Sequence, residues 1–157
     1  MKQDIINHEL HITIPEGFRL LKKEELNQIY MDENAERWGM RNEEEHMIFV
    51  IYYHRSNPLL AALASENDIV KSTQLKLAKG MENHGYAFNG YFRKEACGQE
   101  HPGFDYEYNV GAVRQSGRIL IIKKKNVCYT VYFYTRDNLL DKNLVHFDEV
   151  INSLSFE

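Results

Sequence analysis

FDYEYNVGAVRQSGRILIIKKKNVCYTVYFYT, residues 104–135, is the stretch that decides the fold of this chain. Aromatic and aliphatic residues dominate residues 104–109, 118–125 and 127–135, which is typical of β-strands. Turn-forming residues stand at Gln115-Ser116-Gly117 and at Lys125-Asn126. The stretch therefore predicts three successive strands joined by tight turns, and strands joined in this way pair antiparallel.

A helix is predicted directly after these strands, at residues 141–153. Its apolar residues are spaced 4, 3, 4 and 3 apart and form one continuous stripe, made of Leu140, Leu144, Phe147, Ile151 and Leu154. We expect this stripe to pack on the sheet. On the other side of the stretch, the alternation in residues 86–94 predicts a fourth strand, and residues 95–103 are expected to form a loop.

The first half of the chain predicts the remaining elements. Ser65, with Asp68 three residues later, is a candidate N-cap for a long helix that extends to Gly85, and one or two helical turns are expected at 59–64. A strand at 10–14, a helix at 22–31 and a hairpin of 35–41 with 47–54 precede it. Residues 47–54 are apolar on both faces, which marks an interior strand covered from two sides.

This order of elements predicts an α+β fold of one domain, residues 1–157. Long runs of adjacent strands with segregated helices favour an α/β/α sandwich with a central, mostly antiparallel six- or seven-stranded sheet. A chain of 157 residues with 43% hydrophobic residues buries about two thirds of its unfolded surface, so it needs no disulfide or metal in order to fold.

Two segments of the sequence give the chain a resemblance to a known family. The segment ITIPEGF at 12–18, the order of elements, and the ending FDEVINSLSF at 147–156 resemble the PsbP-like fold family. That family includes an extrinsic subunit of the photosynthetic oxygen-evolving complex, a nuclear-import factor that binds the GTPase Ran, and many bacterial proteins. The resemblance implies a bacterial-type member with a central antiparallel sheet between helical layers, and a role in binding other proteins. It carries over no functional residue.

The charge and composition narrow the classes of partner. The formal net charge is −4 and the isoelectric point about 6.0, so we expect neither nucleic acid nor a membrane surface as a partner. The first ten residues lack the apolar core of a signal peptide, which predicts a cytoplasmic protein. Cys97 and Cys128 are expected to be free thiols, because two cysteines so placed do not suggest a disulfide framework.

Four groups of residues carry reactive or charged side chains without forming a recognisable site. His8 and His11 have a His-x-x-His spacing, but a strand would place them on opposite faces, and Glu43-Glu44-Glu45-His46 reads as a solvated hairpin tip. Lys123-Lys124-Lys125 is interpreted as a solubility feature of a turn. We therefore expect no metal site and no cofactor.

Cys97, Glu100 and His101 form the fourth group. They have the residue types of a thiol nucleophile, an orienting carboxylate and a base. Catalytic sets are defined by geometry in space, so we interpret these residues as a flexible loop with an ordinary thiol. No catalytic residue is assigned.

The surplus of tyrosine is the strongest functional signal. Ten tyrosines are present, most of them in predicted strands, and the few helices are not expected to cover both faces of a large sheet. Tyrosine supplies apolar area with a polar tip and is enriched at interfaces and in ligand pockets. The alternative is that the tyrosines and the single tryptophan complete the core. The candidate binding residues are Trp38, Tyr52, His54, Tyr91, Tyr132 and Tyr134.

Two functions of different classes follow from these residues. The first is a non-catalytic cytoplasmic binding or scaffolding domain that engages a protein partner through an aromatic sheet surface. The second is a small-molecule-binding protein or hydrolytic enzyme whose pocket gathers Tyr52, His54, Tyr91 and His101, with histidine and tyrosine as acid and base. A monomer or a homodimer made through an edge strand is compatible with either function.

Overall fold

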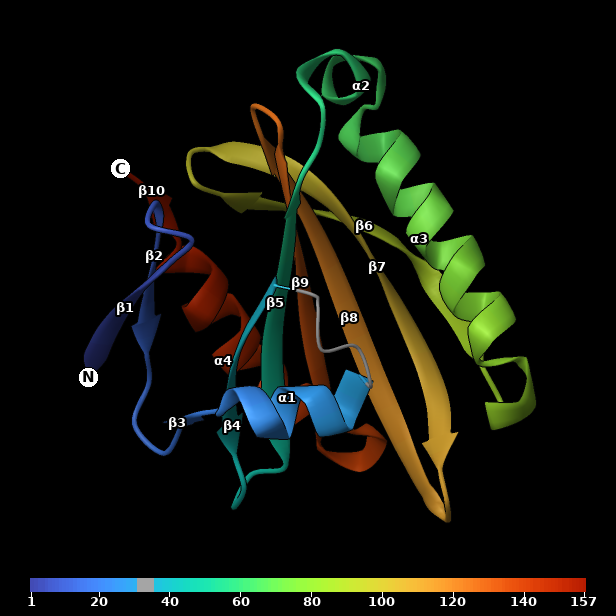
Figure 1. The fold of residues 1–157 in the computed structure, drawn as a ribbon. Helices are drawn as coiled ribbons and strands as arrows, with labels where there is room; N and C mark the ends of the chain where they lie inside the picture. Colours follow the sequence, from blue (N-terminus) through green and yellow to red (C-terminus); the bar gives the residue numbers. More distant parts are fainter. Residues whose placement is uncertain (31–35) are drawn as a thin grey trace.

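A computed structural model describes residues 1–30 and 36–157 of the chain (Figure 1). The described strands form a seven-stranded sheet and a three-stranded sheet, and every pairing is antiparallel. The large sheet has the order β3 (Arg19–Leu20), β4 (Glu36–Asn42), β5 (Met47–Arg55), β9 (Val127–Arg136), β8 (Val113–Lys124), β7 (Gln99–Val110) and β6 (Ala87–Ala96). The small sheet has the order β1 (Lys2–Ile6), β2 (Leu10–Ile14) and β10 (Ser155–Phe156).

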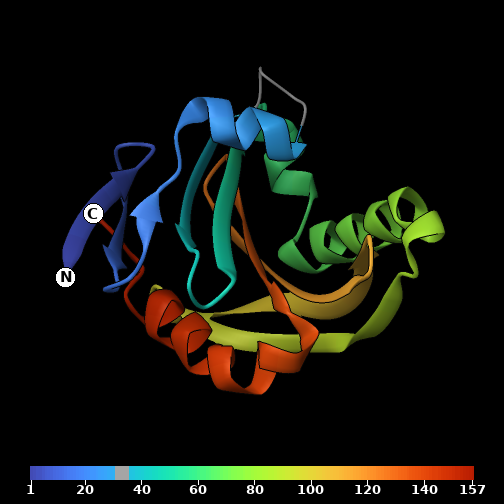
Figure 2. The ribbon, with the colours of Figure 1, turned by 90° about the horizontal axis from the view of Figure 1, so that it is seen from below.

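The helices lie on both faces of the large sheet, as the α/β/α prediction requires. They are α1 (Lys23–Tyr30), α2 (Pro58–Leu63), α3 (Glu66–Gly80) and α4 (Leu140–Asn152), with two short 3-10 turns, η1 (Glu82–His84) and η2 (Asp137–Leu139). Figure 2 shows α4 on one side of the sheet, and α1 and α3 on the other. The predicted α+β class is confirmed, and the antiparallel sheet that was predicted to have six or seven strands has seven.

The alternation of side chains along the central strands places buried clusters on both faces of the sheet. Phe49, Val131 and Phe133 belong to the larger core, which also includes residues of α4 and of the small sheet. Val50 and Ile119 point to the opposite face, where α1 and α3 cover the sheet. Both faces of β5 are therefore largely buried from Met47 to Ile51, as the apolar pattern of 47–54 predicts, whereas Tyr52 and Tyr53 are half-buried and His54 is exposed.

The predicted turn at Gln115-Ser116-Gly117 is wrong. These residues lie inside β8, where Gly117 pairs with Tyr106, and the chain turns instead between Val110 and Val113. Gly117 is required for another reason: a Cβ built on it would lie 2.2 Å from Cζ of Tyr106. The glycine lets the tyrosine ring lie against the backbone of β8 and is not a turn signal.

The predicted loop at 95–103 is also wrong. β6 continues to Ala96 and β7 begins at Gln99, so a two-residue turn, Cys97-Gly98, joins them. Both turn residues have positive φ, 53° and 80°, as a tight hairpin turn requires. Pro102 is tolerated in β7 because the β7–β8 ladder ends at Gly103 and Leu120.

The ends of the other elements differ from the predictions by a few residues. The helix predicted at 22–31 is α1, and the hairpin predicted at 35–41 and 47–54 is β4 with β5; residues 31 and 35 lie outside the described part of the chain. The long helix ends at Gly80, before the predicted Gly85, which adopts the left-handed conformation after η1. Strands β1, β3 and β10 were not predicted.

The start of α3 is capped as predicted. The Ser65 hydroxyl accepts from the backbone N–H of Asp68 at 3.1 Å, and the Asp68 carboxylate accepts from the backbone N–H of Ser65 at 3.3 Å. This capping box satisfies two backbone donors that would otherwise lack partners at the helix end.

Within residues 1–30 and 36–157, no helix combines the length and the apolar character that a membrane crossing demands.

We predict that Gly117→Ala lowers the free energy of unfolding by about 1–3 kcal/mol, because the new methyl group overlaps the buried ring of Tyr106. The matched control is Gly80→Ala in α3, where a Cβ meets no atom within 4 Å. This second variant should gain up to about 1 kcal/mol, because alanine favours the helix. Urea unfolding of both variants tests the prediction, and equal stability of the two would contradict it.

Candidate functional site

The face of the sheet that carries α1 and α3 is incompletely covered. α3 packs mainly on β7 and β8, and α1 packs on β4. Tyr132 of β9 lies between them and contacts the buried residues below both helices. From Tyr132 toward the far end of β9, the side chains of β5 and β9 on this face form the floor of an open depression.

This depression, which we name the α2–α3 groove, has a volume of about 760 Å³. Its floor comes from β5, β8 and β9 and its walls from α2 and α3. The lining residues are Tyr52, His54, Ser56, Leu60, Ala61, Ala64, Asp68, Ile69, Ser72, Thr73, Lys76, Leu77, Lys123, Asn126, Val127, Cys128, Thr130 and Tyr132. The groove is thus apolar and aromatic, with hydroxyl groups and two lysines among its lining.

Two aromatic rings stack on the floor of the groove. The rings of Tyr52 and His54 stack with their centroids 5.6 Å apart and their planes at 27°. Tyr52 pairs with Thr130 and His54 pairs with Cys128 across β5 and β9, so all four side chains share the groove face. Burial raises the pKa of the Cys128 thiol to about 11, so this thiol stays protonated and is a poor nucleophile at neutral pH.

The apolar surface of the groove continues onto α2. Leu60 lines the groove and is 65% exposed, and Leu59 and Leu63 beside it are 78% and 81% exposed. The three leucines occupy positions i, i+1 and i+4 and therefore point to one side of this short helix. Three exposed leucines next to a groove form an apolar patch of the kind that marks an interaction site.

Lys123 holds α2 in this position. Its Nζ donates hydrogen bonds to the carbonyl oxygens of Ala61 and of Ala64, the latter at 2.6 Å, at the C-terminal end of α2. A cation at the C-terminus of a helix satisfies carbonyl groups that have no partner within the helix. The interpretation of Lys123 as part of a solubility feature is therefore wrong, because the side chain is a structural anchor.

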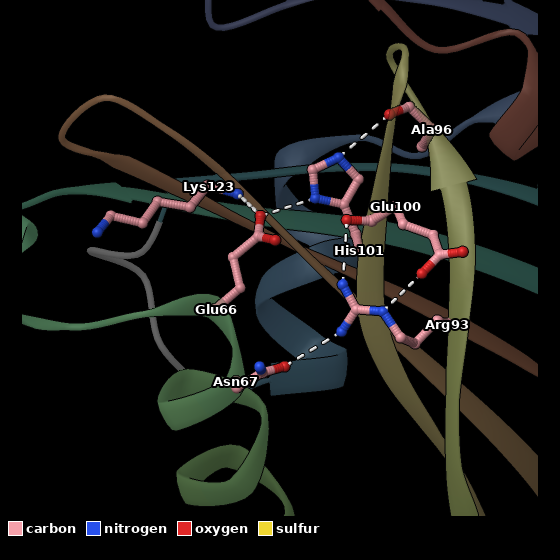
Figure 3. Close-up of polar contacts among 7 residues, drawn as sticks. All are labelled: Glu66, Asn67, Arg93, Ala96, Glu100, His101 and Lys123. Atoms are coloured by element: carbon pink, nitrogen blue, oxygen red, sulfur yellow. Dashed lines mark hydrogen bonds and ion pairs between the residues drawn. The ribbon is translucent and has the colours of Figure 1, made fainter.

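Glu66 connects the start of α3 to the sheet (Figure 3). Its Oε2 accepts from the backbone N–H of Lys123 at 2.7 Å and lies 2.7 Å from Nδ1 of His101. The other ring nitrogen of His101, Nε2, lies 3.1 Å from the carbonyl oxygen of Ala96. β7 has separated from β8 here, and the carboxylate fills the opening between them.

Both ring nitrogens of His101 have hydrogen-bond partners. A carbonyl oxygen can only accept, so Nε2 carries a hydrogen. Nδ1 lies 2.7 Å from the carboxylate oxygen Oε2 of Glu66, within hydrogen-bonding distance. The side chain of His101 is 4% exposed, which makes this a buried charge-assisted pair.

The structure separates Cys97, Glu100 and His101. Both nitrogens of His101 are occupied by Glu66 and Ala96, so this histidine cannot serve as the base of the Cys97 thiol. Glu100 pairs with Arg93 at 2.8 Å on the surface. Partial burial raises the pKa of Cys97, which favours the unreactive thiol. The two cysteines are free, as predicted.

A cluster of tyrosines closes the end of the groove near α1. Tyr30 donates to the hydroxyl of Tyr134 at 3.3 Å, and Tyr134 stacks on Tyr132 with centroids 6.0 Å apart. Burial raises the pKa of Tyr108 to about 12 and raises those of Tyr30 and Tyr134 well above the ordinary value. These phenols stay protonated at neutral pH and cannot act as bases there.

The six predicted binding residues do not form one site. Tyr52, His54 and Tyr132 line the α2–α3 groove, and Tyr134 packs beneath its closed end. Tyr91 is 51% exposed and lines a separate hollow beside β6, where its ring contacts Phe88.

Trp38 and His101 lie elsewhere. The indole N–H of Trp38 donates to Asp4 at 2.8 Å, and Trp38 shares the face of Ile51, opposite to Tyr132. His101 is buried below the start of α3. The pocket that would gather Tyr52, His54, Tyr91 and His101 is therefore not formed, because these side chains lie in three places.

The helical wall of the groove was not predicted from the sequence. Ile69, Thr73 and Lys76 are spaced by three or four residues along α3 and share one side of the helix. The one signal was the segment PLLAAL at 58–63, whose leucines share one side although the helix is too short to bury them. An apolar helix of six residues is a reason to look for an exposed patch.

The polar groups considered as metal ligands lie apart. His8 has a positive φ of 59° and lies in the turn between β1 and β2, and Nε2 of His11 lies 2.8 Å from Glu157. In the part of the chain that the structure describes, no three histidine, cysteine or acidic side chains lie together as metal ligands.

Comparisons with known proteins identify the fold. No protein-family model matches the sequence, and no curated protein matches it. Cyanobacterial PsbP (CyanoP) from Synechocystis sp. PCC 6803 is similar in structure, with a TM-score of 0.64, 12% identity, and coverage of 94% of this chain and 86% of CyanoP.

Two further solved structures share this architecture. LpqN of Mycobacterium tuberculosis, which is involved in cell envelope biogenesis, has a TM-score of 0.55 and 9% identity over 94% of this chain and 82% of LpqN. The Ran-binding protein Mog1p of Saccharomyces cerevisiae has a TM-score of 0.52 and 7% identity over 96% of this chain and 85% of Mog1p. The chain therefore has the PsbP-like fold, which the resemblance of residues 12–18, of residues 147–156 and of the order of elements had implied.

We predict that Glu66→Gln lowers the free energy of unfolding by about 2–3 kcal/mol, because the buried His101 loses its charged partner. Glu82→Gln, on the exposed turn η1, is the matched control and should stay within about 0.5 kcal/mol of the parent. Urea unfolding at pH 7 measures both. If Glu66→Gln were as stable as the control, the Glu66–His101 pair would contribute no more to the free energy of unfolding than an exposed ion pair does.

The tyrosine cluster predicts instability in alkali. Unfolded tyrosines ionise near pH ~10, whereas the buried ones stay protonated, so the unfolded state loses protons first. The contribution of the buried phenols to the free energy of unfolding is fully present below that pH and is lost as the pH rises above it. Melting temperatures between pH 8 and 11.5 should decline steeply above about pH 10, and less steeply in Tyr134→Phe.

Absorbance at 295 nm reports phenolate formation during the same experiment. We expect the buried tyrosines to ionise together with the loss of secondary structure. Ionisation of the whole set in a still folded protein would contradict the proposed burial of their hydroxyls.

Proposed function

We propose that this chain is a non-catalytic cytoplasmic binding domain that holds a protein partner in the α2–α3 groove. The observation that carries the proposal is the continuity of the groove with Leu59, Leu60 and Leu63 on α2. A small solute in the groove would leave Leu59 and Leu63 in water, whereas a protein surface would cover them together with the floor. The partner would thus bury one continuous apolar and aromatic surface.

The chemistry of the groove supports binding without catalysis. The Cys128 thiol stays protonated, and burial also raises the pKa of Tyr132. Neither group is activated toward a substrate at neutral pH. Among the proteins of similar structure, yeast Mog1p is a Ran-binding protein, so the same fold supports protein binding in at least that case.

The second candidate is a small-molecule-binding protein that uses the same groove. Its volume lies in the range of about 300–1,000 Å³ that is usual for ligand pockets. The stacked pair Tyr52 and His54 would accept a flat ring, and Lys76 would pair with an anionic group. This candidate does not account for the exposed leucines of α2.

The edge strand β6 is a further surface that a second copy would use. Of the described strands in the large sheet, β3 and β6 stand at the edges, and β6 carries the exposed rings of Phe88 and Tyr91. An exposed edge strand with aromatic side chains invites pairing. A homodimer made there leaves the α2–α3 groove free, so it is compatible with either candidate.

A photo-crosslinking amino acid at position 60 tests the proposal. We predict that the protein with this residue at 60 forms covalent adducts with one or a few proteins in native cells, because Leu60 lies inside the partner surface. The matched control carries the same residue at position 75, since Leu75 is 67% exposed on α3 but does not line the groove. Adducts that form from position 60 but not from position 75, and that disappear when Leu63→Lys is added, support a protein partner.

A parallel measurement distinguishes the second candidate. The purified protein is heated with a panel of metabolites and nucleotides, and a ligand present at 100 times its dissociation constant adds about 2.7 kcal/mol of stability. A clear rise in melting temperature that is lost in Tyr52→Ala, together with no adducts at position 60, would replace the protein partner with a small molecule.

A further inference from the structure

The floor of the α2–α3 groove restricts the shape of what can lie on it. Its strands β5, β9 and β8 are interior strands, each paired on both sides. β9, the central strand of the floor, is paired with β5 and with β8 from Val127 to Thr135, and β5 is paired on both sides from Met47 to Tyr53. A segment that lies on these residues cannot hydrogen-bond to them as another strand. A segment buried on this floor must satisfy its own backbone groups.

An α-helix is the structure that meets this requirement. All of its central N–H and C=O groups pair within the segment, and only its side chains contact the floor. Helix-in-groove binding uses an apolar stripe at spacings of three and four residues. We infer that the α2–α3 groove takes an amphipathic α-helix of a partner protein, an inference that rests on the proposed function.

The dimensions of the groove set the length of this helix. The floor follows β9 from Val127 to Tyr132, which is about 17 Å at ~3.4 Å per residue. At ~1.5 Å per residue, that distance takes about 11 helical residues, or three turns. One end is closed by Tyr30, whose ring lies 6.1 Å from that of Tyr132, and the other end reaches the leucines of α2.

The position of α3 fits a neighbouring helix. α1 and α3 lie on the same face of the sheet (Figure 2), and the floor residues Thr130 and Tyr132 line the space beside α3. Helices packed side by side stand about 8–10 Å apart. A bound helix would extend the layer that α1 and α3 begin, and would contact the sheet through its apolar stripe and α3 through one flank.

The charges of the groove indicate what this flank carries. Lys76 stands on the α3 wall, and the ammonium group of Lys123 lies at the α2 end. Among the lining residues in 1–30 and 36–157, Asp68 is the one acidic side chain, and its carboxylate is held by the Ser65 cap. The surplus of positive charge favours an acidic residue on the flank that faces Lys76.

Displayed peptide libraries test the inference with defined probes. One library holds 14-residue peptides on an alanine-rich helical framework with varied residues at i, i+3, i+4 and i+7. The other holds 14-residue peptides of β-branched residues with proline, which cannot form helices. We expect enrichment from the helical library alone, with an acidic residue recurring beside the apolar stripe.

Fluorescence anisotropy with the enriched peptides then locates the site. Leu63→Lys should weaken peptide binding at least tenfold. Lys76→Glu should weaken the binding of peptides that carry the acidic residue and leave unchanged the binding of peptides that carry lysine at that position. Leu75→Lys should leave the binding of all peptides unchanged. Circular dichroism should show a gain of helix when peptide and protein are mixed. Leu63→Lys lies on an exposed position, so it should fold like the parent.

The possible failures are distinguishable. Enrichment from the non-helical library would contradict the inference that the partner segment is a helix. Helical peptides whose affinity is unchanged by Leu63→Lys would contradict it as well. In both cases adducts at position 60 would still support a protein partner. Absence of adducts at position 60 would instead count against the proposed function. Leucine-dependent binding to vesicles of phosphatidylglycerol and phosphatidylcholine, with no peptide enriched, would overturn the inference in favour of a lipid surface.

Discussion

The rest of the structure depends on one constraint, that the central strands β5, β9 and β8 of the large sheet carry buried apolar residues on both faces. Phe49 and Val131 face one side, and Val50 and Ile119 face the other. Water must be kept from both sides, because each buried aliphatic side chain contributes about 1.5–3 kcal/mol. The small sheet and α4 cover the first face, whereas α1 and α3 cover the second face only in part. The incomplete layer is what leaves a groove.

The wall of the groove is held by polar contacts and not by an extended apolar contact of α2. Ala61 is the one residue of α2 that is buried, and the amine of Lys123 binds the carbonyl groups at the end of this helix. Glu66, the first residue of α3, joins this helix to His101 and to the backbone of β8. Because these contacts fix α2 without its leucines, the leucines remain available for a partner.

The predictions from sequence succeeded where side-chain period decides the structure and failed where single residues were taken as breaks. Alternation and the 3–4 spacing located β5, β9 and α4 to within one or two residues. Gly117 was interpreted as a turn and Pro102-Gly103 as part of a loop, yet all three lie within strands. Glycine serves a close approach as well as a turn, and the space around it is a tertiary property.

The sequence by itself determined the α+β class, the antiparallel meander and the capping of α3, because periodicity and local hydrogen bonding depend on neighbours along the chain. The PsbP-like fold was implied by the resemblance of residues 12–18, of residues 147–156 and of the order of elements to that family. Tertiary structure decided which candidates meet. It brought Tyr52, His54 and Tyr132 into one groove, placed Trp38 on the other face, and engaged His101 with Glu66, 35 residues away. Such groupings depend on strand order and register, which join residues that lie far apart in the sequence and leave no local pattern.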